Sequence, residues 1–105
     1  KRIAGKYEDA IADCSKAIEL QPDYADAFNN RGLCKYYSGA DGAIEDFTKA
    51  ISINQNYAEA YSNRADYYYY DENNTEACAD WTKAVELGYE KAKRSIAKYC
   101  TSTDK

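Results

Sequence analysis

One eight-residue phrase occurs three times in this chain, and it restricts the fold more than any other feature of the sequence. The copies begin at Asp13, Asp46 and Asp80, which places them 33 and then 34 residues apart. Seven residues before the alanine of each copy stands another alanine, at Ala10, Ala43 and Ala77. Because seven residues make about two turns of an α-helix, each phrase predicts a helix with small residues along one face.

A second phrase lies between the copies of the first. Residues 24–32 read YADAFNNRG, and residues 57–65 read YAEAYSNRA. Two helical phrases that alternate at a fixed interval predict helical hairpins that stack on one another. Small Gly32 and Ala65 would let the two axes of a hairpin approach closely, and the aromatic rings of Phe47 and Trp81 would fill the space beside them.

Together the phrases resemble the tetratricopeptide repeat (TPR), a helix-turn-helix unit of about 34 residues with small and aromatic residues at fixed positions. The resemblance covers residues 5–88. The chain departs from the family pattern at Arg31 and Arg64, where the family has leucine, at Lys35 in place of tyrosine, and at Cys14 in place of phenylalanine. The resemblance implies an all-α fold: a right-handed α-solenoid with one partial and two full repeats, followed by a C-terminal capping helix.

The repeat register also divides the chain into segments. Residues 1–22 would hold the second helix of a truncated first repeat, 23–56 the second repeat, 57–88 the third, and 89–105 the capping helix and tail. We expect helices near residues 6–20, 24–38, 42–54, 58–71, 75–87 and 89–100. Pro22 stops the first of these helices, and Gly88 suits a left-handed cap after the fifth.

The turn at residues 39–42 is one residue shorter than its counterpart in the next repeat. A tolerated deletion would explain this difference. The other hypothesis is that the flanking helices merge, or that they swap between two chains.

TPR arrays present the first helix of each pair to a concave groove, so the resemblance implies that this chain binds a partner protein or peptide. The groove positions are Asn29, Asn30, Leu33, Tyr36 and Tyr37 in one repeat and Glu59, Asn63, Asp66, Tyr69 and Tyr70 in the next. Asparagine can both donate and accept hydrogen bonds, and tyrosine offers a large contact area at low entropic cost. Because four consecutive tyrosines at residues 67–70 cover every side of a helix, we assign Tyr68 to the core.

The groove positions also predict the charge of the partner. Asp26, Glu59 and Asp66 would repel an acidic C-terminal peptide of the kind that some TPR proteins bind. We therefore expect a neutral or basic partner with apolar or aromatic anchors.

A structural module that assembles with its own copies is the second functional hypothesis. Helix 6–20 lacks the first helix of its repeat, which suggests that upstream residues belong to the protein. Its apolar residues Ile11, Cys14 and Ile18 would stay uncovered unless another segment or another chain packs on them. A homo-oligomer through this helix is therefore an alternative to peptide binding.

Other classes of function lack the residues that they need. The chain has no histidine, no glycine-rich phosphate loop and no thiol beside a base, which argues against an enzyme. Four cysteines without a C-x-x-C pair predict neither a metal site nor a cofactor. Residues 1–89 carry 9 basic and 16 acidic side chains, which disfavours nucleic acid as a partner, and no apolar run reaches the length of a membrane span.

We interpret the cysteines and the repeated Asp–Lys spacing as structural features. Cys14, Cys34 and Cys78 occupy apolar repeat positions, so we expect unpaired thiols, which favour a reducing compartment such as the cytoplasm. The aspartate and lysine that stand three residues apart in each phrase would pair on the exposed side of the helix.

Overall fold

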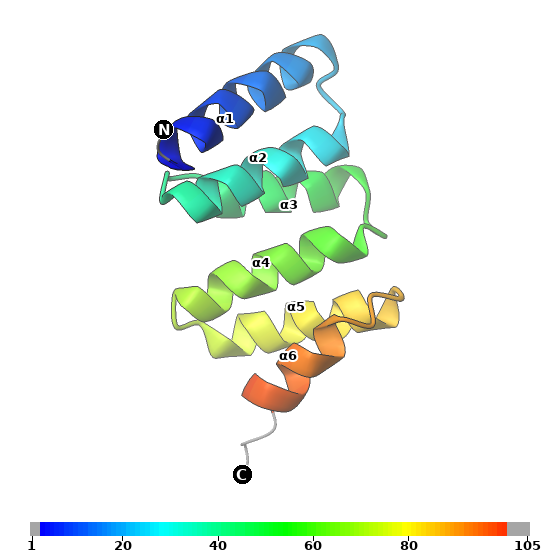
Figure 1. The fold of residues 1–105 in the computed structure, drawn as a ribbon. Helices are drawn as coiled ribbons and strands as arrows, with labels where there is room; N and C mark the ends of the chain where they lie inside the picture. The colour runs from blue at the N-terminus through cyan, green and yellow to red at the C-terminus, as the bar shows by residue number, and fades with distance from the viewer. Residues whose placement is uncertain (1–2, 101–105) are drawn as a thin grey trace. The chain divides into compact units, whose positions relative to one another are not determined.

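The computed structural model describes residues 3–100, and within this range the regular structure is entirely helical. The helices are α1 (Ile3–Leu20), α2 (Ala25–Ser38), α3 (Ala43–Ile53), α4 (Ala58–Tyr70), α5 (Asn74–Glu86) and α6 (Ala92–Tyr99) (Figure 1). This confirms the all-α prediction. The chain divides into two compact units, one up to Gln55 with α1 to α3 and one from Asn56 with α4 to α6.

The first unit is built on the close approach of α2 and α3. Phe47, Ala43 and Ala50 on α3 are fully buried. A Cβ atom added to Gly32 of α2 would lie 2.7 Å from Cε1 of Phe47, so only glycine lets the ring pack at this depth. The predicted pairing of a small residue with an aromatic one is confirmed here.

The short turn between α2 and α3 contains two glycines in left-handed conformations. Gly39 has φ of 81°, and its N–H caps α2 by donating to the carbonyl oxygen of Lys35. Gly42 has φ of 101° and precedes α3. Because these glycines reverse the chain within four residues, α2 and α3 are separate helices that pack within one chain, and the hypothesis that they merge is wrong.

The second unit has a larger aromatic core. Trp81 of α5 is 1% exposed, and the alanines around it are also buried: Ala65, Ala77, Ala84 and Ala92. Helix α6 supplies the last of these and packs against α5, which agrees with the expected capping position. It begins at Ala92 instead of residue 89, because the chain first turns through Gly88, which has φ of 105°.

The start of helix α6 has the same backbone hydrogen bond as the starts of α2 and α4, which are the first helices of the two full repeats. The N–H of Ala92 donates to the carbonyl oxygen of Tyr89 at 3.2 Å. The matching bonds join Ala27 to Tyr24 and Ala60 to Tyr57, both at 3.1 Å. Helix α6 therefore takes the position that a first helix takes in this repeat.

Each full repeat contains a buried ion pair between its two helices. Arg31 donates two hydrogen bonds of 2.8 Å to the carboxylate of Asp46. Arg64 binds Asp80 in the same two-pronged manner, at 2.7 and 3.0 Å. The two aspartates are only 4% and 6% exposed.

The expectation that these aspartates pair with the lysine three residues on, at the exposed side of the same helix, is therefore wrong for both full repeats; Asp46 also pairs with Lys35 of the facing helix, at 3.1 Å. Local spacing alone suggested the lysine, which stands three residues away. Arginine reaches Asp46 and Asp80 from the facing helix with two parallel hydrogen bonds, and such a pair is stronger than an exposed contact within one helix. The departure from the family pattern at Arg31 and Arg64 thus has a structural reason.

The expectation of unpaired thiols is also wrong for two of the four cysteines. Cys78 of α5 and Cys100, which directly follows α6, form a disulfide with Cα atoms 5.9 Å apart. Cys14 and Cys34 are free thiols. Because Cys78 and Cys100 are paired, these two cysteines give no support to a reducing compartment.

Candidate functional site

Helix α2 carries the predicted groove positions of the first full repeat, which we call the α2 face: Asn29, Asn30, Leu33, Tyr36 and Tyr37. Asn30 is exposed and Tyr37 is 61% exposed. Leu33 and Tyr36 are half-buried. Asn29 is only 5% exposed, so its side chain is not presented to a partner.

An aromatic cluster supports the end of the α2 face. The rings of Tyr36 and Tyr37 lie 5.3 Å apart between centroids. Tyr7 on α1 lies 6.0 Å from Tyr37. Contact with neighbouring rings restricts the rotamers of Tyr37, which lowers the entropic cost of using its exposed part in binding.

The predicted groove positions of the next repeat form the α4 face: Glu59, Asn63, Asp66, Tyr69 and Tyr70. Glu59 is exposed and Tyr70 is 76% exposed, whereas Asn63 and Asp66 are half-buried. Tyr70 stands 33 residues after Tyr37, at the same repeat position. The first helices of the two full repeats, α2 and α4, therefore each carry an exposed tyrosine near their C-terminal end.

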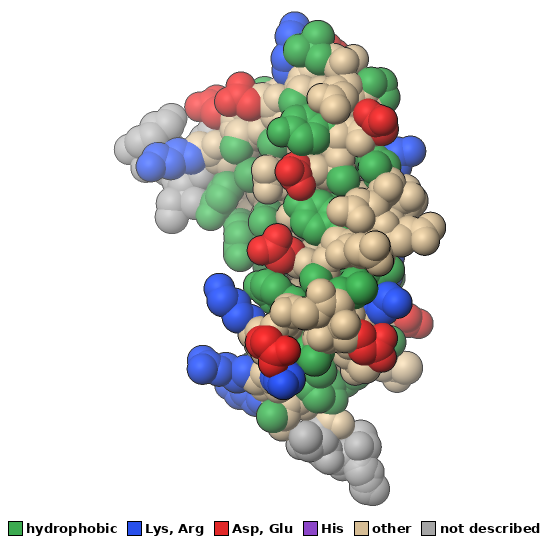
Figure 2. All heavy atoms as spheres, turned by 90° about the vertical axis from the view of Figure 1, so that its right-hand side faces the viewer, with side chains coloured by type: hydrophobic (Ala, Val, Ile, Leu, Met, Phe, Trp, Pro, Cys, Tyr) green, Lys and Arg blue, Asp and Glu red, His purple; other side chains and the backbone are tan. Residues whose placement is uncertain are grey.

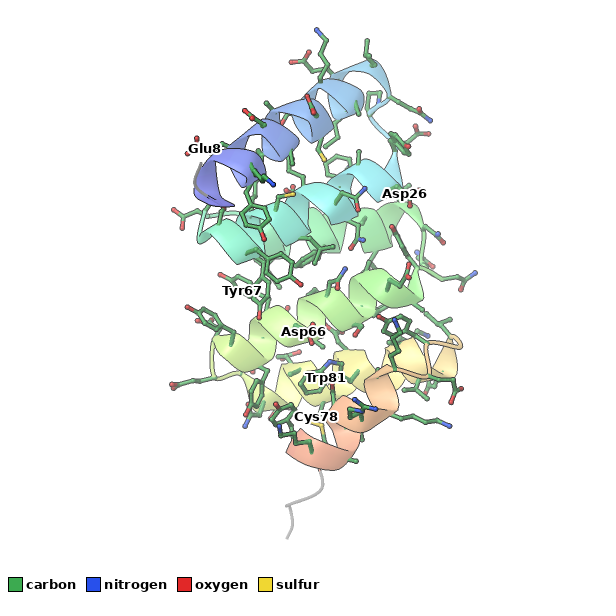
Figure 3. The ribbon with its side chains drawn as sticks, viewed as in Figure 1. Glu8, Asp26, Asp66, Tyr67, Cys78 and Trp81 are labelled. Carbon is green, nitrogen blue, oxygen red and sulfur yellow. A yellow bond between two sulfur atoms is a disulfide. The ribbon has the colours of Figure 1, made fainter. Side chains whose placement is uncertain are left out.

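Asp66 has a second role that the repeat pattern did not indicate. One of its carboxylate oxygens accepts a hydrogen bond of 3.1 Å from Nε1 of Trp81, and both side chains are labelled in Figure 3. Burial raises the pKa of Asp66, and the hydrogen bond from Trp81 opposes part of this rise. Asp66 therefore satisfies the one polar atom of a buried indole besides being half-exposed on the α4 face.

Tyr69 likewise divides its surface between solvent and core. It is 38% exposed, and its ring centroid lies 4.1 Å from that of Tyr99 on α6 and 5.9 Å from that of Trp81. Tyr68 packs against the Trp81 core, as predicted. Of the two tyrosines assigned to the groove, Tyr70 is thus the more accessible.

Charge on the surface is mixed. Figure 2 shows acidic side chains scattered among apolar ones, a class that includes tyrosine in its colouring. Asp26 and Glu59 are exposed at corresponding positions of α2 and α4. Lys91, Arg94 and Lys98 of the α6 region are exposed as well.

The apolar residues of α1 form a third candidate surface, the α1 face: Ile11, Cys14 and Ile18. All three are half-buried, whereas Phe47 and Ile51, which correspond to Cys14 and Ile18, are buried in α3. Burial raises the pKa of the Cys14 thiol, and the nearby Cys34 of α2 adds to the rise. At neutral pH this thiol is therefore protonated and weakly nucleophilic.

Within residues 3–100, no three side chains of the metal-binding types come together. None of the described helices combines the length and the apolar character needed to cross a bilayer.

Sequence reasoning missed three contacts: the Arg–Asp pairs, the Trp81–Asp66 hydrogen bond and the disulfide. The sequence did contain a signal for the Arg–Asp pairs, since Arg31 and Asp46 recur as Arg64 and Asp80 at nearly the same separation. The other two occur in only one repeat. A contact that is not repeated leaves no internal comparison from which to predict it.

The fold and the repeat register together define an all-α protein of the helical-repeat class. The family model described as TPR repeat matches this chain over residues 2–39, and the solved structures with the same fold, given below, include a TPR.

Several solved structures share this fold. A crystal structure of MamA superposes with a TM-score of 0.75 at 35% identity over 84% of this chain and 52% of that one. A second MamA structure gives a TM-score of 0.70 at 31% identity over 94% and 52% of the two chains. The first TPR of Spaghetti (RPAP3), bound to the HSP90 peptide SRMEEVD, gives 0.77 at 24% identity over 89% of this chain and 82% of that one.

One curated protein is similar over a shorter stretch. Protein SGT1 homolog of Bos taurus is 40% identical over 35 residues, which are 33% of this chain and 10% of that protein. The chain thus spans a tenth of the length of this relative and about half the length of the MamA chains.

Proposed function

We propose that this chain is a protein-interaction module that binds partner peptides, with the α2 face and the α4 face each offering a binding surface within its own unit. Proteins with TPR repeats generally mediate protein–protein interactions. The observation that carries the proposal is the recurrence of an exposed tyrosine at one repeat position, as Tyr37 and Tyr70. A folded protein gains no core stability from these exposed rings, whereas tyrosine is enriched among the residues that dominate binding energy.

The residues around the two tyrosines suit a peptide backbone. Asn30 is exposed on α2, and Asn63 is half-exposed on α4 at the corresponding position. Each primary amide can donate to a peptide carbonyl and accept from a peptide N–H. Leu33 and Tyr36 add apolar surface beside Asn30.

The partner that we propose is neutral or basic and has apolar or aromatic anchors. The TPR of RPAP3 holds a peptide with acidic residues near its end. In this chain Asp26 and Glu59 are exposed on the corresponding helices, and they would repel such a peptide.

A peptide-display selection against the whole chain tests this proposal. Selected peptides should be enriched in aromatic and basic residues, and the Tyr37→Ala/Tyr70→Ala variant should bind them at least about tenfold more weakly by calorimetry. The matched control is Lys49→Ala/Lys83→Ala, which alters exposed positions on the second helices and should leave the affinity unchanged. Equal affinity for the tyrosine variant, or a set of acidic peptides, would show that the proposal is wrong.

The α1 face supports self-assembly as a second candidate function. Cys14 and Ile18 are half-buried where the matching Phe47 and Ile51 of α3 are buried, so additional apolar area remains to be covered. Ile11→Asp should then abolish a dimer seen by sedimentation velocity and leave helicity unchanged. A wild-type chain that sediments as a monomer at high concentration would remove this candidate.

A further inference from the structure

We propose that the Cys78–Cys100 disulfide is a redox-controlled latch that holds α6 over Trp81. The disulfide joins Cys78, in the first half of α5, to the residue that follows α6, across a separation of 22 residues. It therefore ties down the far end of the helix, while the chain itself ties the near end through Gly88 and Tyr89. This inference goes beyond the proposed peptide binding and does not depend on it.

Apart from the disulfide, α6 is held in place by one side of a short helix. The helix has eight residues, and isolated helices of fewer than about 12 are marginal in water. Its inner side consists of buried Ala92 with half-buried Ile96 and Tyr99. The ion pair between Lys93 and Glu90 is exposed and joins α6 to a residue just before it. It therefore does not hold α6 against α5.

The disulfide therefore supplies a large share of what keeps α6 docked. Closing a loop of this length shifts the equilibrium towards the docked form by on the order of a hundredfold. Cys78 and Cys100 are both half-buried, and a small dithiol can reach them. One thiolate of the dithiol attacks the disulfide and its second thiol completes the exchange. Two electrons and two protons pass to the protein, which gains two thiols while the dithiol becomes a cyclic disulfide.

Release of α6 would uncover an aromatic surface within the second unit. The ring of Tyr99 is stacked 5.7 Å from the indole of Trp81 and lies 4.1 Å from Tyr69. Cys78 and Trp81 are labelled beside α6 in Figure 3. Loss of Tyr99 would leave the indole and the Tyr69 ring open to solvent or to a partner.

The chain carries its own probe for this movement, because Trp81 is the only tryptophan in the sequence. Acrylamide quenching of its fluorescence should be weak in the oxidised chain, in which Trp81 is 1% exposed. Treatment with dithiothreitol should raise the quenching constant severalfold. Amide exchange at Cys100, which donates to the carbonyl oxygen of Ile96, should accelerate by roughly a hundredfold, while the α4 and α5 amides keep their protection.

Two variants make the test specific. Cys14→Ser/Cys34→Ser removes the free thiols and should respond to dithiothreitol as the wild type does. Cys78→Ser/Cys100→Ser should behave as the reduced form with or without dithiothreitol, and the reduced wild type gives the same information if this variant does not fold. Equal quenching before and after reduction would overturn the proposal. So would loss of protection throughout α4 and α5, or a mass spectrum of the untreated chain that shows free Cys78 and Cys100.

Discussion

Replacing Arg64 with methionine should lower the free energy of unfolding by about 3 kcal/mol, because it leaves the carboxylate of Asp80 buried without its partner. Asp80 is 6% exposed and accepts both of its short hydrogen bonds from Arg64. Water cannot replace these bonds without opening the interface between α4 and α5. Urea unfolding followed by Trp81 fluorescence measures the loss in the unit where it occurs.

The control for this prediction is the double variant Arg64→Met/Asp80→Leu. Replacing both charges with apolar side chains of similar volume removes the desolvation penalty together with the attraction, so most of the lost stability should return. Asp80→Leu alone should cost less than Arg64→Met, since the arginine side chain is 18% exposed and can be hydrated. If both single variants and the double variant have wild-type stability, the pair contributes nothing to the fold.

Truncation of Trp81 to alanine should cost about 4 kcal/mol, the largest effect that we expect from one substitution. The side chain is 1% exposed and packs among four buried alanines, which cannot move together to fill the space that the indole leaves. The truncation also leaves Asp66 without the hydrogen bond from the indole. Thermal unfolding followed by circular dichroism reports this loss, since the fluorescent group is absent.

The repeat itself provides the matched control. Phe47 occupies the position of Trp81 in the preceding repeat, so Trp81→Phe keeps an aromatic ring of a size that this fold accepts. We expect it to cost about 1 to 2 kcal/mol, from the smaller ring and the lost hydrogen bond. A cost as large as that of Trp81→Ala would mean that the hydrogen bond to Asp66, and not the filled volume, dominates.

The sequence predicted the number and order of the helices well, and their ends less well. The helix expected at residues 6–20 begins at Ile3, and the one expected at 89–100 begins at Ala92. The periodicity of small and aromatic residues indicates where a helix must lie. Its ends depend on local turns such as that at Gly88, where the pattern carries less information.

The candidate site was predictable in part. Tyr37, Tyr70, Asn30 and Glu59 are exposed at the positions that the repeat register assigned to them. Asn29 is buried, and Asp66 and Tyr69 share their surfaces with Trp81 and Tyr99. A register predicts the direction in which a position points from its helix, but another helix can cover that position.

By itself the sequence determined that this chain folds as alternating helices with small residues facing aromatic ones. The reason is that helical periodicity is a local property, which can be counted along the chain without knowledge of any partner. Only the tertiary structure decided which carboxylates are buried beside arginine, which cysteines are joined and which tyrosines remain exposed. Those outcomes depend on distances of a few ångströms between helices remote in sequence, and the spacing of residues along one helix does not contain them.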